Sequence, residues 1–260
     1  MGDPGTSLFG PAVAAFAAID QLLPVALGPL ARLIAWGCVM SIVSMGLYRF
    51  FSPQRKIATL RKQAAGARQQ LADFDGEFEQ LMPIVQRSLL LSLRQIGWIF
   101  FPALLASLPL VACLIWLESA YSFQAPSAGQ RVAVTVLPMG ATIGAEPGSA
   151  LEQGPGGVFV IWPAAGGMVT LFDDRRTALM TLDAGSPGAD VIEPRRWWNA
   201  IIGNPLGYLP AGSSVARLEF GFPGLPVLGQ RATWYSGWAA PFFTTLIVLS
   251  LLIKVVFRIE

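Results

Sequence analysis

The clearest pair of carboxylates in this sequence is Asp173 and Asp174, which Arg175 and Arg176 follow directly. Two carboxylates that share a site can perform acid–base catalysis or bind a metal ion. Neighbouring residues on a strand, however, point to opposite faces of the sheet, so these two side chains would not converge. The pattern therefore favours a solvated turn over a catalytic pair.

Other catalytic groups are scarce. The chain has no histidine, which removes the commonest general base and metal ligand. Both cysteines, Cys38 and Cys113, lie in apolar segments, where free thiols behave as small hydrophobic residues. No Ser/His/Asp set, phosphate-binding loop or dinucleotide motif occurs. We therefore expect no enzyme, no metal and no cofactor, and the net charge of +2 does not indicate nucleic acid binding.

The composition indicates a membrane protein. Hydrophobic residues make up 53% of the chain and charged residues 13%, where soluble domains have roughly 25% charged residues. A spanning helix needs about 20 mostly apolar residues, and residues 26–51, 96–117 and 238–260 each contain such a stretch. Residues 1–25 are interrupted by Asp20 and Pro24, so they predict an N-terminal segment with a short helix at the membrane interface.

The distribution of Lys and Arg predicts one orientation for all three spans. Residues 49–95 contain eight Lys or Arg and four acids, whereas residues 118–237 contain seven Arg and nine acids. Positive charges near the ends of spans stay in the cytoplasm. We therefore expect residues 52–95 and the C-terminus inside, with the N-terminus and residues 118–237 outside.

Residues 52–95 have the spacing of a coiled coil. Apolar residues recur at alternating intervals of three and four, as at the a and d positions of a heptad. Both ends of this segment must return to the same membrane face, so we expect a helical hairpin that turns between Asp73 and Gly76. The predicted seam contains Ile57, Leu60, Leu71, Phe74, Phe78 and Leu81.

Within the hairpin, the unbroken heptad predicts that Leu60 packs near Phe78 or Leu81 on the return arm. Pro83 is expected to kink the second arm or to begin it anew. The alternative is an amphipathic helix that lies on anionic lipid through its Lys and Arg residues.

Residues 118–237 alternate short apolar runs with clusters of Gly and Pro, which is typical of short strands joined by turns. We expect a small all-β domain, either a sandwich or an open barrel. Pro194 would begin a short helix over 194–202 that carries Trp197 and Trp198. Their rings could pack in the domain core, lie at the membrane interface or contact a partner.

The predicted fold class is an α-helical membrane protein with three transmembrane helices and a cytoplasmic coiled-coil hairpin, plus a small extracytoplasmic all-β domain. The first span ends in a basic and aromatic sequence made of Arg49, Phe50, Phe51, Pro53, Arg55 and Lys56. The second span contains two prolines and then an aromatic residue, namely Pro102, Pro109 and Trp116. With the order of span, coiled coil and span, residues 45–121 resemble the core of the YidC/Oxa superfamily of membrane protein insertases. The three-span branch, with archaeal YidC-like proteins and insertase subunits of the endoplasmic reticulum, is the most similar in size.

The resemblance implies a wet groove, open to the cytoplasm and to lipid, that receives the segment being inserted. Its cation would be Arg49, which would attract acidic residues of short translocated tails. An arginine at a span end also commonly extends to the lipid headgroups. Small residues on one stripe of the first span would line the groove or allow tight helix packing. The candidate groove residues are Gly37, Ser41, Ser44, Tyr48, Arg49, Pro102 and Pro109.

The implied function is that of an insertase or membrane chaperone, whose coiled coil captures nascent membrane proteins or docks a partner. The alternative is a non-catalytic accessory or scaffold subunit of a larger membrane complex, a hetero-oligomer that is contacted through the outer β domain. The expected partners are the lipid bilayer and either nascent membrane proteins or other membrane subunits. A β domain on the outside, without a eukaryotic-type signal, suggests a bacterial inner membrane with this domain in the periplasm.

Overall fold

A computed structural model describes residues 7–24, 26–74, 78–154, 157–184, 189–204, 207–229 and 235–258, without the side chains of residues 78–81. Asp75 and Gly76 of the expected turn, and the side chains of Phe78 and Leu81 of the expected seam, therefore lie outside the described residues. The chain divides into two units, and each is considered by itself. The helical unit comprises Leu33–Val111 and Pro241–Glu260, and the β unit comprises Met1–Arg32 and Ala112–Ala240.

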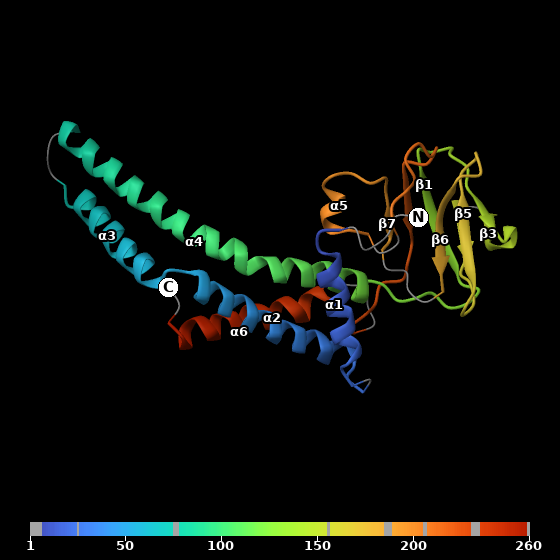
Figure 1. The fold of residues 1–260 in the computed structure, drawn as a ribbon, viewed down its shortest axis with the longest axis horizontal. Coiled ribbons are helices and arrows are strands. Elements are labelled where there is room, and N and C mark those ends of the chain that lie inside the picture. Colours follow the sequence, from blue (N-terminus) through green and yellow to red (C-terminus); the bar gives the residue numbers. More distant parts are fainter. Residues whose placement is uncertain are drawn as a thin grey trace. The chain divides into compact units, whose positions relative to one another are not determined.

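In the described part of the chain, three helices are long and apolar enough to cross a membrane (Figure 1). They are α2, Pro29–Phe51; α4, Phe78–Tyr121, through its apolar part; and α6, Ala239–Val256. Their number and approximate positions agree with the three apolar stretches that were expected to span. These helices indicate an integral membrane protein.

α4 is longer than the sequence predicts. Instead of a separate arm and span, one helix of 44 residues contains Pro83, Pro102 and Pro109. Pro83 does not begin the arm, because α4 starts at Phe78, and a proline near a helix start removes only one backbone hydrogen bond. At 1.5 Å per residue α4 is about 66 Å long, roughly twice the hydrocarbon thickness of a bilayer. A large part of α4 must therefore extend beyond a membrane.

α3, Gln54–Ala72, and the first half of α4 form the two arms of a hairpin (Figure 1). The Lys56 ammonium lies 4.8 Å from the centre of the Trp98 ring, and the Arg68 guanidinium donates a hydrogen bond to Ser92 Oγ at 3.3 Å. Higher numbers on α3 thus face lower numbers on α4, so the arms are antiparallel. Along α3, the apolar heptad positions that are buried are Ile57, Ala64 and Ala67, and those that are half-buried are Leu60 and Leu71. Phe74, just after α3, is also half-buried.

The register of this hairpin differs from the expected pairing of Leu60 with Phe78 or Leu81. Leu60 lies one helical turn beyond Lys56, which contacts Trp98. Arg68, two turns further along α3, contacts Ser92, so Leu60 faces α4 between positions 92 and 98. Even position 92 is 11 residues from position 81, or about 16 Å. The expected pairing was wrong because the heptad positions were counted continuously through the turn. In a hairpin, the residues that face one another depend instead on where the chain reverses.

The described part of the β unit contains two antiparallel sheets (Figure 1). One has the strand order β3-β4-β1-β8-β7 and the other the order β2-β5-β6. The strands are β1 Arg131–Leu137, β2 Gly144–Glu146, β3 Leu151–Gly154, β4 Gly157–Ile161, β5 Met168–Phe172, β6 Ala178–Asp183, β7 Val191–Ile192 and β8 Arg217–Phe220. Val132 and Leu218 of the first sheet share one core with Leu171 and Leu182 of the second. Of the two expected architectures, a sandwich and an open barrel, the β unit is therefore a sandwich.

The two acids Asp173 and Asp174 lie in the turn between β5 and β6, as expected. Asp173 is buried, however, and one of its carboxylate oxygens accepts hydrogen bonds from the backbone N–H groups of Arg175 at 3.0 Å and Thr177 at 2.7 Å. Burial raises the pKa of this carboxyl, but the backbone hydrogen bonds outweigh burial and hold the pKa below its ordinary value. Asp174 is exposed. Asp173 thus shapes the turn, and the two carboxylates share no site.

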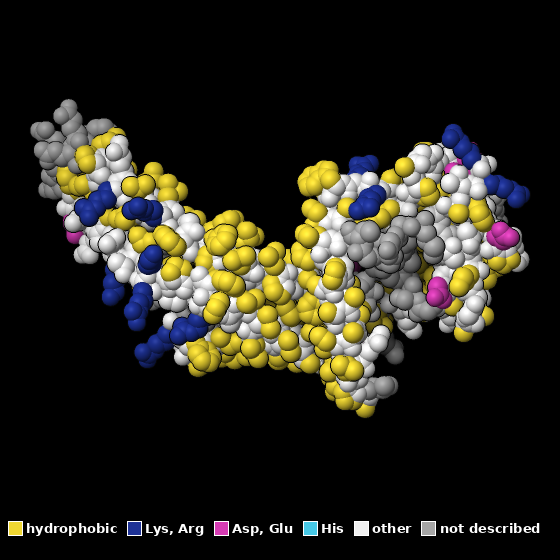
Figure 2. All heavy atoms as spheres, viewed as in Figure 1, with side chains coloured by type: hydrophobic (Ala, Val, Ile, Leu, Met, Phe, Trp, Pro, Cys, Tyr) yellow, Lys and Arg dark blue, Asp and Glu magenta, His cyan; other side chains and the backbone are white. Residues whose placement is uncertain are grey.

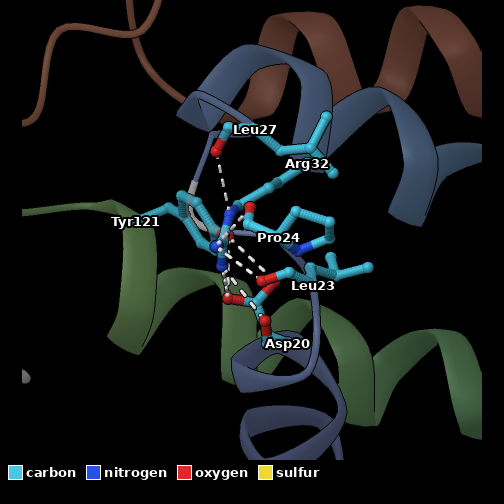
Figure 3. Close-up of polar contacts among 6 residues, drawn as sticks. All are labelled: Asp20, Leu23, Pro24, Leu27, Arg32 and Tyr121. Atoms are coloured by element: carbon cyan, nitrogen blue, oxygen red, sulfur yellow. Dashed lines mark hydrogen bonds and ion pairs between the residues drawn. The ribbon is translucent and has the colours of Figure 1, made fainter.

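Polar contacts hold together the segments around α1, Gly10–Gln21, in the β unit (Figure 3). Arg32 forms an ion pair with the Asp20 carboxylate at 2.8 Å, with 18% and 16% of these side chains exposed. The Tyr121 hydroxyl, at the end of α4, donates a hydrogen bond to the same carboxylate at 3.1 Å. Arg32 also donates hydrogen bonds of 3.1–3.3 Å to the backbone carbonyls of Leu23, Pro24 and Leu27.

The helix expected over 194–202 is reduced to α5, Asn199–Ile202. The preceding side chains are exposed, Trp197 by 81% and Trp198 by 43%. The interpretation of these rings as core residues is therefore wrong. Other aromatic residues fill the core instead, namely Trp162, Phe220 and Phe222.

Candidate functional site

The candidate site lies at the elbow where α2 ends and α3 begins, inside the helical unit. The Ser52 N–H still donates to the Tyr48 carbonyl at 2.8 Å, but the helix cannot continue because Pro53 has no N–H and restricts the residue before it. The Pro53 carbonyl then accepts hydrogen bonds from Lys56 and Ile57, which start α3. One proline thus ends a spanning helix and starts the arm.

A depression of about 780 Å³ opens at this elbow. It is lined by Gly46, Arg49, Phe50, Ser52, Pro53, Gln54, Arg55 and Lys56. A second depression of about 470 Å³ shares Pro53 with it, and is lined also by Phe51, Arg94, Gly97, Trp98, Phe101 and Pro102. We call the two depressions together the elbow site.

The elbow site is strongly cationic. Arg49, Arg55, Lys56 and Arg94 all line it, and no Asp or Glu is among the residues that line either depression. The Arg49 and Arg94 guanidinium groups form no hydrogen bond or ion pair with the residues that the structure describes. Figure 2 shows the Lys and Arg side chains gathered over the α3 arm, next to the hydrophobic side chains of the spanning helices. Such a surface attracts anionic groups at the edge of an apolar region.

Ser52 adds a polar group whose hydrogen-bonding capacity is not used by the described fold. Its side chain is buried, and among the described residues its Oγ has no hydrogen-bond partner. A buried hydroxyl without a partner costs free energy, so such groups commonly mark a position where water or a ligand binds. Ser52 lines the larger depression together with Arg49. The elbow therefore offers a hydrogen-bonding hydroxyl beside its cations.

Three of the candidate groove residues lie elsewhere, between helices. At Gly37 an added Cβ would lie 2.9 Å from Thr245 Cβ of α6. Ser41 is fully buried and its Oγ lies 2.9 Å from Ser250 Oγ of α6. Ser44 donates a hydrogen bond of 3.3 Å to the Ala106 carbonyl of α4. These small residues allow the spanning helices to pack closely, which is the alternative to lining a groove.

Of the remaining candidate groove residues, two line the elbow site and two do not. Arg49 and Pro102 line the elbow site, one in each depression. Tyr48 and Pro109 are half-buried and line neither of them. The structure therefore brings Arg49 and Pro102 to adjoining depressions and keeps Gly37 and Ser41 apart from them.

Sequence reasoning missed the contribution of α4 to this site. Arg94, Trp98 and Phe101 recur at intervals of four and three residues, which places them on one face of a helix. That spacing was visible in the sequence, but only the fold shows that this face meets the elbow. No sequence pattern predicts that the Ser52 hydroxyl is part of the site, because its burial depends on the elbow.

No metal cluster was found among the described residues, in which no group of three or more His, Cys, Asp or Glu converges. The class of protein that the fold defines is an integral membrane protein with an added β sandwich. Comparison with known proteins finds no matching family model, no matching curated protein and no matching solved structure.

Proposed function

We propose that this chain is an insertase or membrane chaperone of the YidC/Oxa type, which receives segments of other membrane proteins at the elbow site. The observation that carries the proposal is a cationic depression where an apolar helix ends, with a buried hydroxyl that has no hydrogen-bond partner in the part of the chain that the structure describes. A segment entering a membrane carries polar groups that hydrocarbon cannot satisfy. A wet depression at the membrane edge lowers that cost.

The proposed role of each residue follows from its surroundings. Arg49 is exposed and would attract the carboxylates of a short translocated tail. Trp98 and Phe101 would contact the apolar part of the same segment from the other side of Pro53. Ser41 belongs to helix packing and takes no part in client contact.

The proposal includes an orientation. The excess of Lys and Arg in residues 49–95 supports an orientation with the hairpin and the elbow site in the cytoplasm. The β sandwich would then lie outside, in the periplasm of a bacterial inner membrane. The hairpin would then meet nascent chains before they reach the bilayer. Its partners are the bilayer and nascent membrane proteins.

A reconstituted insertion assay tests this function. Arg49→Ala is expected to lower insertion of a client with a short acidic tail about threefold or more, because the depression loses the cation at its membrane edge. Arg49→Lys should keep most activity, since a point charge suffices. Arg87→Ala is the control, because Arg87 is an exposed cation on the α4 arm of the same hairpin and lines neither depression. A client whose acidic residues are replaced by Gln should not distinguish the variants.

The second candidate function is that of a scaffold subunit. It is favoured by the packing of Gly37, Ser41 and Ser44, which removes both serines of α2 from any groove. Equal insertion by wild type and Arg49→Ala, at equal protein abundance, would reject the insertase proposal. Purification in mild detergent with one stoichiometric set of subunits would then support the scaffold.

A further inference from the structure

A second surface stands out in the β unit, well separated in sequence from the elbow. Just before and within α5 it exposes two tryptophans, Trp197 by 81% and Trp198 by 43%, and two isoleucines at about 40% or more. We call it the Trp197 patch; it contains Arg195, Arg196, Trp197, Trp198, Ile201 and Ile202. Figure 2 shows hydrophobic side chains beside Lys or Arg side chains over α5. Exposed rings and aliphatic chains of this size mark a contact surface.

The fold of this loop does not depend on the exposed rings. Asn199 Oδ1 accepts the backbone N–H of Arg196 at 2.6 Å, and Asn199 Nδ2 donates to the Pro194 carbonyl at 3.0 Å. The Tyr208 hydroxyl donates to the Asn199 carbonyl at 2.9 Å. Polar side chains thus hold the backbone from inside while the apolar ones face outward. This is the reverse of the usual pattern for a protein surface in water.

Contacts within the β unit place the patch near the end of a spanning helix. At Gly203, next to the patch, an added Cβ would lie 2.8 Å from Ser7 Cβ, just before α1. Further along α1, the ring of Phe16 stacks on Trp116 of α4 with centroids 6.0 Å apart, and Asp20 accepts the Tyr121 hydroxyl. Figure 1 shows α1 crossing the end of α4, and α5 lying near the start of α1.

α1 itself carries features of a helix at a membrane surface. None of its residues is buried, and apolar side chains next to or within it are exposed, among them Leu8 by 73% and Leu22 by 83%. Its one charged side chain, Asp20, is neutralised by Arg32. The exposed apolar side chains around α1 and those of the Trp197 patch thus belong to segments that contact one another near the end of α4.

We propose that the Trp197 patch docks the β unit onto the lipid bilayer from which α4 and α6 emerge. The Trp197 and Trp198 rings enter the boundary between headgroups and acyl chains, where tryptophan is most favourable. The Arg195 and Arg196 guanidinium groups bind lipid phosphates, which accept paired hydrogen bonds from arginine. The patch lies between α4 and α6 in sequence, so it is tethered to the membrane and needs little affinity of its own to stay bound.

The test measures the depth of position 197 in the full chain. Cys38 and Cys113 are replaced by Ala, Trp197→Cys is labelled with an environment-sensitive fluorophore, and the protein is reconstituted in phosphatidylcholine–phosphatidylglycerol vesicles. Lipids with a nitroxide near the headgroup should quench the label at 197 about threefold more than a label at Met139→Cys. Met139 is the matched control, because it is 92% exposed in the same unit without neighbouring cations in the sequence.

Each outcome decides the proposal. Strong quenching at 197 supports docking on lipid. Quenching no greater than at Met139→Cys overturns it, and a buried but unquenched label would assign the patch to a protein contact instead. If the labelled Trp197→Cys chain fails to fold, the same measurement at Trp198→Cys replaces it.

A second arm of the experiment tests the cations. With Arg195→Gln and Arg196→Gln together, quenching of the label at 197 should fall about twofold in vesicles that contain phosphatidylglycerol. Unchanged quenching would overturn the assignment of these arginines to lipid phosphates. Both results are independent of insertion activity, since the elbow site lies in the other unit.

Discussion

The two ends of α2 each carry an arginine, and the surroundings of these two residues are opposite. Near the start, 18% of the Arg32 side chain is exposed, and it binds the Asp20 carboxylate and several backbone carbonyls. At the end, Arg49 is exposed and its guanidinium has no partner among the described residues. The difference separates a cation that completes a structure from one that is available to a ligand.

The comparison shows why a charge in a span cannot be interpreted from its residue type. Arg32 neutralises the Asp20 carboxylate of α1 and donates hydrogen bonds to backbone carbonyls at and after the end of α1, including that of Leu23. Arg49 has cations for neighbours, Arg55 and Lys56, and a depression beside it. Mutations around Arg32 should lower stability, whereas mutation of Arg49 should lower insertion activity. The predictions below test this distinction.

The largest expected effect on stability is at the Arg32 end. Asp20→Ala leaves a mostly buried guanidinium without its carboxylate and removes the acceptor of the Tyr121 hydroxyl. Loss of one partner from such a pair should be clearly destabilising and should lower the thermal unfolding temperature in detergent by several degrees. The double variant Asp20→Asn, Arg32→Gln should lose less, because no charge remains unpaired. An unchanged unfolding temperature for Asp20→Ala would contradict a structural role for this end.

An intermediate effect is expected in the middle of α2. Gly37→Ala places a methyl group 2.9 Å from Thr245 Cβ, so α6 must shift, at a cost of about 1–3 kcal/mol. Gly46→Ala is the matched control, since an added Cβ there meets no atom within 4 Å. It should be neutral or slightly stabilising, because Ala favours a helix over Gly by roughly 0.5–1 kcal/mol. Equal stability of the two variants would mean that α2 and α6 do not pack as described.

The smallest effect on stability is expected at the Arg49 end. Arg49→Ala should change the free energy of unfolding by no more than about 0.5 kcal/mol, because an exposed side chain with no partner contributes little. The same denaturation measurement used for Asp20→Ala checks this. A large destabilisation would place Arg49 with Arg32 among the structural cations and would leave the elbow site without its main residue.

The parts of the fold that the sequence predicts are those that depend on local pattern. Long apolar stretches indicate spans, and alternation in Arg131–Leu137 indicates a strand that buries every second residue at its start. The contact of Asp20 with Tyr121 joins residues 101 positions apart, and no local pattern predicts such a pair. The candidate site was predicted as far as Arg49, since its cationic sequence is local. The α4 side of the site was not, because it depends on where the hairpin reverses.

The Trp197 patch shows a second kind of limit. Apolar side chains at Trp197, Trp198 and Ile202 look the same in a sequence whether they face a core or a membrane. Only the sandwich shows that its core is complete without them, filled by Trp162 and Phe222. Hydrophobicity alone predicts burial but does not identify what covers the side chain.

The contact between Ser41 and Ser250 has a consequence for the biogenesis of the protein. The two residues are 209 positions apart, so at about 5–20 residues per second the ribosome needs roughly 10–40 s to supply the second hydroxyl after the first. During that interval α2 is already synthesised, yet its polar stripe has no partner from α6. Until residue 250 is made, the Ser41 hydroxyl can donate to a backbone carbonyl of its own helix, so the contact between α2 and α6 is completed only at the end of synthesis.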